Sequence, residues 1–512
     1  MPTPHVFVAA LCVGIALANA WRPGVVVALA GALAFGGVAA RSHGVGRVAV
    51  TAVALGAAGA AWGSARLDAL DRSLLEGHIG RAERSLVVTT GPVRRTPFGL
   101  RVPARVERFG ALWVDEAVLL ELPLGRAPPQ GSRLDLVAVV ERPRQSSEGF
   151  DERDWLRRKG VHVVIRGRRW VIVGRRGGIL GVADRLHARL DATIAPGLDG
   201  ERRAILRGVV LGEDEGLTRE LRDAFRASGL YHLLAVSGQN VALLVGGVLA
   251  LAWLLGIPRL PAQVGALVAI AAYVLAVGWQ PSVVRAGVAG GLASLAWLTA
   301  RQRDRWWFLL VGALVLLAWN PYAALEPGFQ LSFGAVAAIF VAVPRFARLF
   351  EGYPMPSSLR DVLAVSSACG LATAPIAWLH FGAVPLYTVP ANALAAPVVG
   401  SLLGLGLIAA ALHPFAPGAA ALVAWANGWC ASYLAACARA VASLPSAQLG
   451  STRSLLVVGG LLALPLVWPR LHRPRAARAA VLVVMVLAAN VAWRDAPQAA
   501  GPPPDGLRMT FL

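Results

Sequence analysis

The amino-acid sequence predicts a polytopic α-helical membrane protein of about 13 spans, with a small extracytoplasmic β-barrel domain inserted after the third span. Hydrophobic residues make up 56% of the 512 residues and charged residues only 15%, whereas soluble domains carry about 25% charged residues. Many apolar stretches approach or exceed the roughly 18 residues that cross a bilayer as a helix. Residues 64–230 differ from the rest because they are charged and contain short β-like runs.

Residues 1–63 contain the N-terminal transmembrane helices, at about 5–20, 24–40 and 45–63. The first of these has the length of a secretory signal peptide. No basic residues precede it, however, and two further apolar segments follow at once. We therefore expect a retained membrane anchor.

Residues 64–180 are predicted to form the β domain. The β-like runs are SLVVTTGPV, LWVDEAVLLELP, SRLDLVAVV and VHVVIRGRRWVIVG, and turn residues separate them. FDERDWLRRKG lies between the last two runs and predicts a short helix. Five or so short strands with one helix indicate an OB-like barrel.

The β domain is basic, with 20 Arg plus Lys against 11 Asp plus Glu between residues 81 and 176. Basic OB folds often bind single-stranded nucleic acid through backbone charge and aromatic stacking. The candidate DNA-binding arginines are Arg94, Arg95, Arg101, Arg105, Arg166, Arg168 and Arg169. Four aromatic residues, Phe98, Phe109, Trp113 and Trp170, either stack on bases or fill the core of the domain.

Residues 181–230 are predicted to be an amphipathic helical linker. Leu217, Leu221 and Phe225 recur every four residues, and arginines occupy the other face. Such a helix either lies on the membrane surface or packs on the β domain.

Residues 231–493 form the predicted transmembrane core. Its ten apolar segments lie at about 233–256, 262–279, 283–300, 306–319, 329–343, 361–380, 386–412, 419–444, 454–468 and 479–493. Segment 386–412 is either one span or a re-entrant pair around its prolines. With thirteen spans, the short basic loops at 41–47, 301–305, 344–350 and 469–478 all fall on one side. The positive-inside rule then predicts an inner-membrane protein with a cytoplasmic N-terminus, and with the β domain and the C-terminal tail (494–512) outside.

Four polar residues open the first core segment, in GLYHLLAVSGQNVALL: His232, Ser237, Gln239 and Asn240. If residues 232–243 are helical, His232 and Gln239 lie within about 20° of each other, and all four share one arc of roughly half the circumference. Polar groups at membrane depth must face protein or water. The arc is therefore either hydrogen-bonding contact between helices or the wall of a hydrophilic path.

Two later stretches have the same character. In QPSVVRAG, Arg285 lies about one turn into a span and either reaches the interface or faces a phosphate. In EPGFQLSF, Glu326, Gln330 and Ser332 enter the next span, although Glu326 alone is equally consistent with a helix cap. We expect these segments to converge on one cavity, where helix N-termini favour an anion.

Several classes of site are not expected. The single lysine, Lys159, lies in RRKGV and cannot complete a P-loop. The four cysteines (Cys12, Cys369, Cys430 and Cys437) lie in apolar segments without a C-x-x-C pattern, so we interpret them as buried thiols. No metal site and no cofactor are predicted.

The motifs HLLAVSGQN, VVLGEDEGLTRELRDAFRASG, QPSVVRAG and EPGFQLSF together resemble the core of the ComEC competence proteins. GFDERDWLRRKGV resembles the end of that family's extracytoplasmic domain, and TAPIAWLHFGAVPLYTVPANALAAP resembles a later core stretch that contains Asn392. The likeness covers most of residues 20–470. It implies an inner-membrane channel that passes single-stranded DNA into the cytoplasm during natural transformation, and it adds Asn392 to the candidate DNA path.

The resemblance also implies partners: single-stranded DNA, a separately encoded DNA receptor, and a cytoplasmic translocation ATPase or single-strand-binding proteins. Many family members continue into a metallo-β-lactamase-like domain. Here GLRMTFL (506–512) resembles the first strand of that domain, and its H-x-H-x-D-H pattern is absent. We therefore expect no enzymatic activity from this chain, with a separate nuclease subunit as one possibility. The alternatives are a transporter of a small solute or lipid precursor and, less favoured, a membrane-anchored nuclease.

Overall fold

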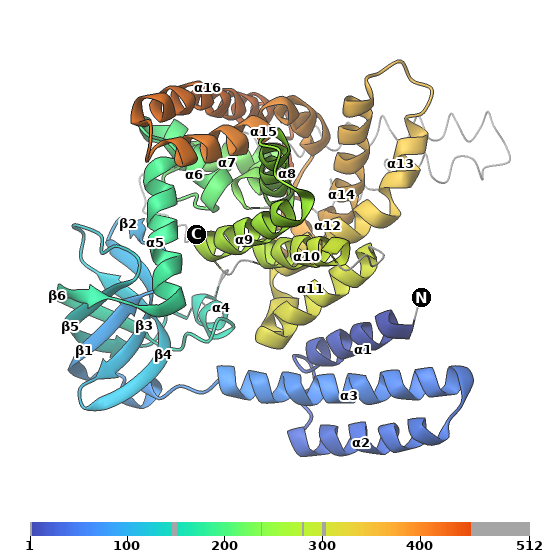
Figure 1. Ribbon diagram of the computed structural model, residues 1–512. Helices are drawn as coiled ribbons and strands as arrows, with labels where there is room; N and C mark the ends of the chain where they lie inside the picture. Colours follow the sequence, from blue (N-terminus) through green and yellow to red (C-terminus); the bar gives the residue numbers. More distant parts are fainter. Residues whose placement is uncertain (1–2, 146–150, 237, 279–280, 299–303, 452–512) are drawn as a thin grey trace. The chain divides into compact units, whose positions relative to one another are not determined.

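The computed structural model describes residues 3–145, 151–236, 238–278, 281–298 and 304–451 (Figure 1). The chain divides into two compact units. The first consists of Met1–Thr193 and Ser237–Phe329, and the second of Ile194–Val236 and Gln330–Phe511.

The first unit begins with three helices, α1 (Thr3–Leu17), α2 (Val25–Arg41) and α3 (Gly44–Leu70). Both α1 and α2 pack along α3 (Figure 1). Glycines allow the backbones of α1 and α3 to meet, since a Cβ on Gly59 would lie 2.5 Å from the carbonyl oxygen of Leu11. Such small-residue contacts are typical of helix pairs in membranes.

A six-stranded sheet follows. Its strands are β1 (Ala82–Thr89), β2 (Arg94–Thr96), β3 (Gly99–Phe109), β4 (Leu112–Leu122), β5 (Ser132–Glu141) and β6 (Val164–Arg175). The order is β1-β5-β6-β4-β3-β2, and β1 also pairs with β3, so the pairing returns to its first strand. The β4–β6 pair is parallel and the other pairs are antiparallel. Alternate side chains, including Val102, Leu120 and Leu134, point into one apolar core.

The four predicted β-like runs are confirmed as β1, β4, β5 and β6, but β2 and β3 were not predicted. The short helix is confirmed as α4 (Glu152–Arg157), whose first turn is capped by the carboxylate of Asp151. A short 3-10 helix, η1 (Leu75–His78), precedes β1, and helix α5 (Gly178–Thr193) follows β6.

The remaining elements of the first unit are α8 (Gly238–Leu254), α9 (Arg259–Val277), α10 (Pro281–Leu298), α11 (Arg305–Trp319) and η3 (Pro321–Leu325). Helices α8, α9 and α10 contact one another, and α11 packs on α10 and α1. The SGQN motif leads into α8 of this group, and the QPSVVRAG motif leads into α10.

The second unit contains α6 (Gly200–Leu211), α7 (Arg219–Ser228), η2 (Tyr231–Leu234), α13 (Val343–Leu349), α14 (Ser357–Phe381), β7 (Val384–Pro385), α15 (Thr388–Leu412), α16 (Pro417–Ala442) and β8 (Gln448–Leu449), and most of α12 (Pro327–Val341). The apolar residues of the predicted linker, Leu217, Leu221 and Phe225, are buried. Helices α6 and α7 pack on α16, and α6 also packs on α15. Residues 194–230 of the predicted linker are thus part of the helical core of the second unit, whereas α5 belongs to the first unit. The expectation that Leu217, Leu221 and Phe225 form an apolar face free for the membrane surface is wrong.

Among the described residues, five helical segments are long and apolar enough to cross a membrane: Gly44–His78, Arg259–Val277, Ser357–Phe381, Thr388–Leu412 and Pro417–Ala442. The pair α12 and α13, bent by 52°, would make a sixth. The structure therefore supports a polytopic membrane protein without confirming thirteen spans, and segments 454–468 and 479–493 lie outside the described residues.

Two local expectations are corrected. Residues 388–412 form one continuous helix with Pro397 inside it, so the re-entrant alternative is wrong. The predicted basic loop at 344–350 is largely helical, because α13 continues the chain after the bend that ends α12.

Candidate functional site

The stretch from Gly229 to Leu244 is not one helix. Gly229 ends α7 in the left-handed conformation (φ +76°), and a Cβ there would clash with Thr388. The short η2 turn follows, Ala235 is extended, and α8 begins only at Gly238. The predicted arc, which assumed about 100° per residue throughout, is therefore wrong.

His232 belongs to the second unit and is held locally. Its Nδ1 lies 2.8 Å from the carbonyl oxygen of Gly229, and the side chain remains exposed. The neighbouring Tyr231 hydroxyl donates to Asp214 at 2.6 Å. The η2 turn is thus fixed by polar contacts within the unit.

The start of α8 meets α9 and α10 in the first unit. The Asn240 amide donates to the Tyr273 hydroxyl at 3.3 Å, and both side chains are buried. Arg285 is only 9% exposed, and its Nη2 would lie 4.0 Å from a Cβ on Gly238. Gln239 is exposed, and Ser237 lies outside the described residues.

A buried guanidinium therefore lies beside the N-terminal end of α8. That end carries the partial positive charge of the helix dipole. Together they make a position whose charge favours an anion. The expected convergence of the three polar stretches on one cavity stays a prediction. Asn240, by contrast, takes part in contact between helices.

Glu326 lies near Lys159, at the end of α4 in the β domain, and their charges interact. Loss of water around the two groups lowers the pKa of Lys159 and raises that of Glu326, although Lys159 still reaches solvent. Lys159 Nζ also lies 3.8 Å from the ring centre of Trp155. Sequence reasoning missed this meeting of the RRKGV and EPGFQ stretches.

A second set of contacts holds α4 in place. Asn320 Nδ2 donates to the carbonyl oxygen of Arg158 at 2.9 Å. The adjacent Tyr322 hydroxyl contacts Asp71 Oδ1 at 2.9 Å, and Arg22 Nη1 pairs with Asp71 at 2.8 Å. We call Asn320, Tyr322, Asp71 and Arg22 the η3 clamp. It joins the sheet domain to the helices of its own unit.

The other core candidates belong to the second unit. Gln330 Oε1 lies 2.9 Å from His380 Nε2, which links α12 to α14. Ser332 and Asn392 are half-buried in α12 and α15. His380 was missed because a lone histidine in an apolar helix gives no spacing signal.

The arginines of the β domain fall into two groups. Arg101 pairs with Glu121 and Glu152, Arg105 with Asp115, and Arg166 with Glu121 and Glu141, at 2.5 to 3.2 Å. These five ion pairs reduce the charge that the three arginines offer to a ligand. Arg94, Arg95, Arg168 and Arg169 are exposed. The basic surface is therefore smaller than predicted.

The four aromatic candidates also divide. Phe98 and Trp113 are 85% and 78% exposed and remain available for stacking. Phe109 is 1% exposed, and Trp170 packs against the same core, so both are structural.

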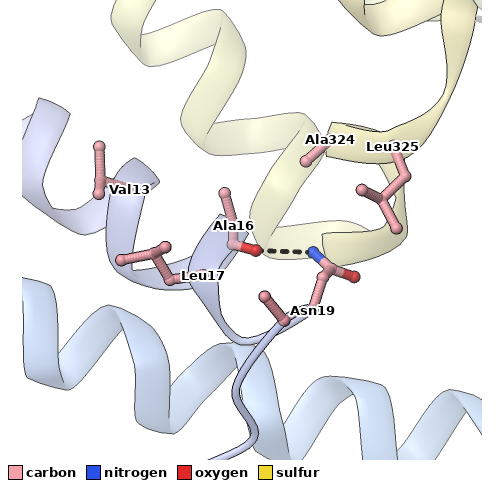
Figure 2. A pocket seen from close by; sticks show the side chains of 7 residues that line it. Val13, Ala16, Leu17, Asn19, Ala324 and Leu325 are labelled. Carbon is pink, nitrogen blue, oxygen red and sulfur yellow. Dashed lines mark hydrogen bonds between the residues drawn. The ribbon is translucent and has the colours of Figure 1, made fainter.

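A pocket of about 350 Å³ lies where the end of α1 meets the end of η3 (Figure 2). It is lined by Val13, Ala16, Leu17, Asn19, Ala20, Ala324 and Leu325. Figure 2 shows Asn19 bonded to the carbonyl oxygen of Ala16, at 3.0 Å. None of the predicted path residues lines this largely apolar pocket.

Comparison with known proteins gives one family. The Competence protein family model matches residues 209–474, just over half of the chain. The chain is 30% identical over 200 residues to ComE operon protein 3 of Bacillus subtilis, covering 39% of this chain and 25% of that protein. It is 32% identical over 228 residues to Competence protein ComA of Neisseria gonorrhoeae, covering 42% and 31%.

A third relative, the uncharacterized protein YcaI of Escherichia coli, is 28% identical over 225 residues, covering 41% of this chain and 29% of YcaI. The matches thus span about a quarter to a third of the relatives' lengths. No solved structure matches. The chain belongs to the competence protein family, and the resemblance of its motifs to ComEC-type proteins is confirmed.

Proposed function

We propose that this protein is an inner-membrane channel that passes single-stranded DNA into the cytoplasm during natural transformation. The matching family model and the name of one relative refer to competence, and the matched segment contains α8, α10 and α14. The proposal assigns the transmembrane helices of the matched segment to the DNA path.

The observation that carries the proposal is buried Arg285 beside the start of α8. An arginine at membrane depth costs free energy and marks an ion or substrate pathway in many membrane proteins. Here its charge adds to the helix dipole, which attracts anions. A passing DNA phosphate suits this position.

The sheet domain is proposed to be an OB-like domain on the extracytoplasmic side, with the N-terminus of the chain in the cytoplasm. The closed order of its strands and its basic composition support this assignment. Exposed Arg94, Arg95, Arg168 and Arg169 would hold the DNA backbone, with Phe98 and Trp113 stacking on bases.

Single-stranded DNA is thus the proposed ligand. A DNA receptor, a translocation ATPase or single-strand-binding proteins, and a separate nuclease are the proposed partners. The nuclease would degrade the strand that does not enter, which leaves translocation to this chain.

The test is a transformation assay in a deletion strain complemented with wild-type protein, Arg285→Gln or Arg259→Gln. Arg259 is the matched control because it begins α9 and is exposed. We expect Arg285→Gln to reduce transformation by about tenfold or more, equivalent to roughly 1.4 kcal/mol, at equal amounts of protein in the membrane. The control should transform normally.

Normal transformation by Arg285→Gln would refute the role of this arginine. Normal transformation of the deletion strain would refute the channel itself and favour transport of a small solute or lipid precursor.

A further inference from the structure

The end of β6 and the start of α5 expose a run of apolar side chains. Val171, Val173, Ile179 and Leu180 are 66%, 55%, 73% and 59% exposed, and Ile172 and Val182 are exposed as well. We call these six residues the β6–α5 surface. Single exposed apolar residues are ordinary, but a group of six within the twelve residues from Val171 to Val182 indicates an interaction site.

In the first turns of α5, apolar side chains are exposed and a carboxylate is buried. Gly181, Ala183 and Asp184 are buried, whereas Ile179 and Leu180 before them and Val182 among them are exposed. Asp184 Oδ1 accepts from Arg176 Nη2 at 2.6 Å and from Gln130 Nε2 at 2.9 Å. These bonds fix the start of α5 to the sheet and hold its apolar side chains outward.

Exposed arginines border this surface. Arg175 lies at the end of β6, and Arg185 and Arg189 lie on α5. Apolar side chains bordered by arginines are complementary to a bilayer interface, whose acyl region accepts the former and whose anionic headgroups attract the latter.

The same helix packs against a candidate membrane span. Helix α5 contacts α9, and His187 Nδ1 lies 2.8 Å from the carbonyl oxygen of Ala276. Ala276 is in the last turn of α9, which is long and apolar enough to cross a membrane. At 1.5 Å per residue, Leu180 is roughly 10 Å along α5 from His187. If α9 spans the bilayer, the membrane–water interface at the C-terminal end of α9 lies close to the β6–α5 surface.

We propose that the β6–α5 surface docks onto the membrane, with its apolar side chains at the acyl boundary and its arginines on anionic lipid headgroups. The docking would hold the β domain at a fixed height over the bilayer. It does not depend on the proposed DNA channel.

The test uses full-length protein in nanodiscs that contain phosphatidylglycerol. Cys12, Cys369, Cys430 and Cys437 are first replaced, and a single cysteine at Val173 or Leu180 is labelled with a fluorophore. Labels at Phe98 and Trp113 are controls because those side chains are also exposed on the β domain. Quenching is measured with shallow spin-labelled lipid and with aqueous iodide.

We expect lipid quenching at Val173 and Leu180 to exceed that at the control sites by at least about twofold, and iodide quenching to be correspondingly smaller. Replacing Arg175, Arg185 and Arg189 by glutamine should lower the lipid quenching, as should neutral lipid. Iodide quenching equal to the controls would overturn the proposal. Shielding from both quenchers would also overturn it, because a protein surface would then cover these residues.

Discussion

The charges of Lys159 and Glu326 form one of the contacts that hold α4 within the first unit. The chain's one lysine lies 167 positions before Glu326, yet their charges interact. Each charge offsets part of the free energy that the other loses when water is removed from it. The pair therefore adds an electrostatic contact to the hydrogen bond between Asn320 and the backbone of Arg158.

Reversing either charge should weaken the docking of α4, because it places like charges together. Lys159→Glu and Glu326→Lys are each expected to lower the thermal unfolding midpoint of the protein in nanodiscs. The cost is about 1 kcal/mol or less, since Lys159 reaches solvent. The double reversal should recover most of the loss. Losses that simply add would show that the two residues do not interact.

Acidification tests Glu326 separately. Burial raises the pKa of Glu326 above its ordinary value of 4.5, so the folded protein takes up this proton at a higher pH than the unfolded chain. Its contribution to stability is fully present below 4.5 and is lost as the pH rises through the folded pKa. Relative to Glu326→Gln, the wild-type protein should therefore gain stability as the pH falls through this window, as measured by denaturant unfolding. If the difference in stability between the wild-type protein and Glu326→Gln does not change with pH, the pKa of Glu326 is not raised.

At the scale of elements, the start of α8 separates two neighbouring residues with different roles. Asn240 is buried and bonded to Tyr273, whereas Gln239 is exposed one position earlier. Asn240→Leu should lower the amount of protein in the membrane, because losing a hydrogen bond between helices costs about 1 kcal/mol. Gln239→Leu should leave that amount unchanged, and immunoblots of membrane fractions would measure both. Equal losses would contradict this assignment.

Sequence patterns predicted the elements whose signal is local. Buried and more exposed side chains alternate along β4 and β5, and Asp151 is a typical N-cap residue before α4. Strand β3 was missed because Pro103 and its arginines mask the inward residues Val102, Ala104 and Val106. The break before α8 was missed because Ala235 and Val236 read as apolar helix in sequence. Contacts across long separations, such as Gln330 with His380, leave no local signal.

At the scale of the whole molecule, a net charge of +20 suggests a general attraction for polyanions. The ion pairs of the β domain show that this charge is not uniformly available. Arg105 is paired with Asp115, whereas Arg168 and Arg169 are exposed on β6. Binding should therefore depend on which arginine is removed.

Full-length protein in neutral-lipid nanodiscs should bind single-stranded oligonucleotides less tightly as salt increases. Replacing Arg168 and Arg169 together by glutamine should reduce the slope of log K against log salt by about 1.4, at roughly 0.7 per phosphate contact. Arg105→Gln is the control and should change the slope little. Fluorescence anisotropy measures both, and equal slopes in all three proteins would exclude β6 from the DNA contact.

The η3 clamp has a consequence for how the protein is assembled during synthesis. Every strand of the sheet has been translated once Arg175 is added, but Asn320 and Tyr322 are made more than 140 residues later. Domains generally fold as units while the chain is still growing. The sheet can thus fold and contact the end of α3 early, because His162 Nε2 lies 2.7 Å from the carbonyl oxygen of Leu70. The bonds made by Asn320 and Tyr322 are added only once the second half of the unit has been translated.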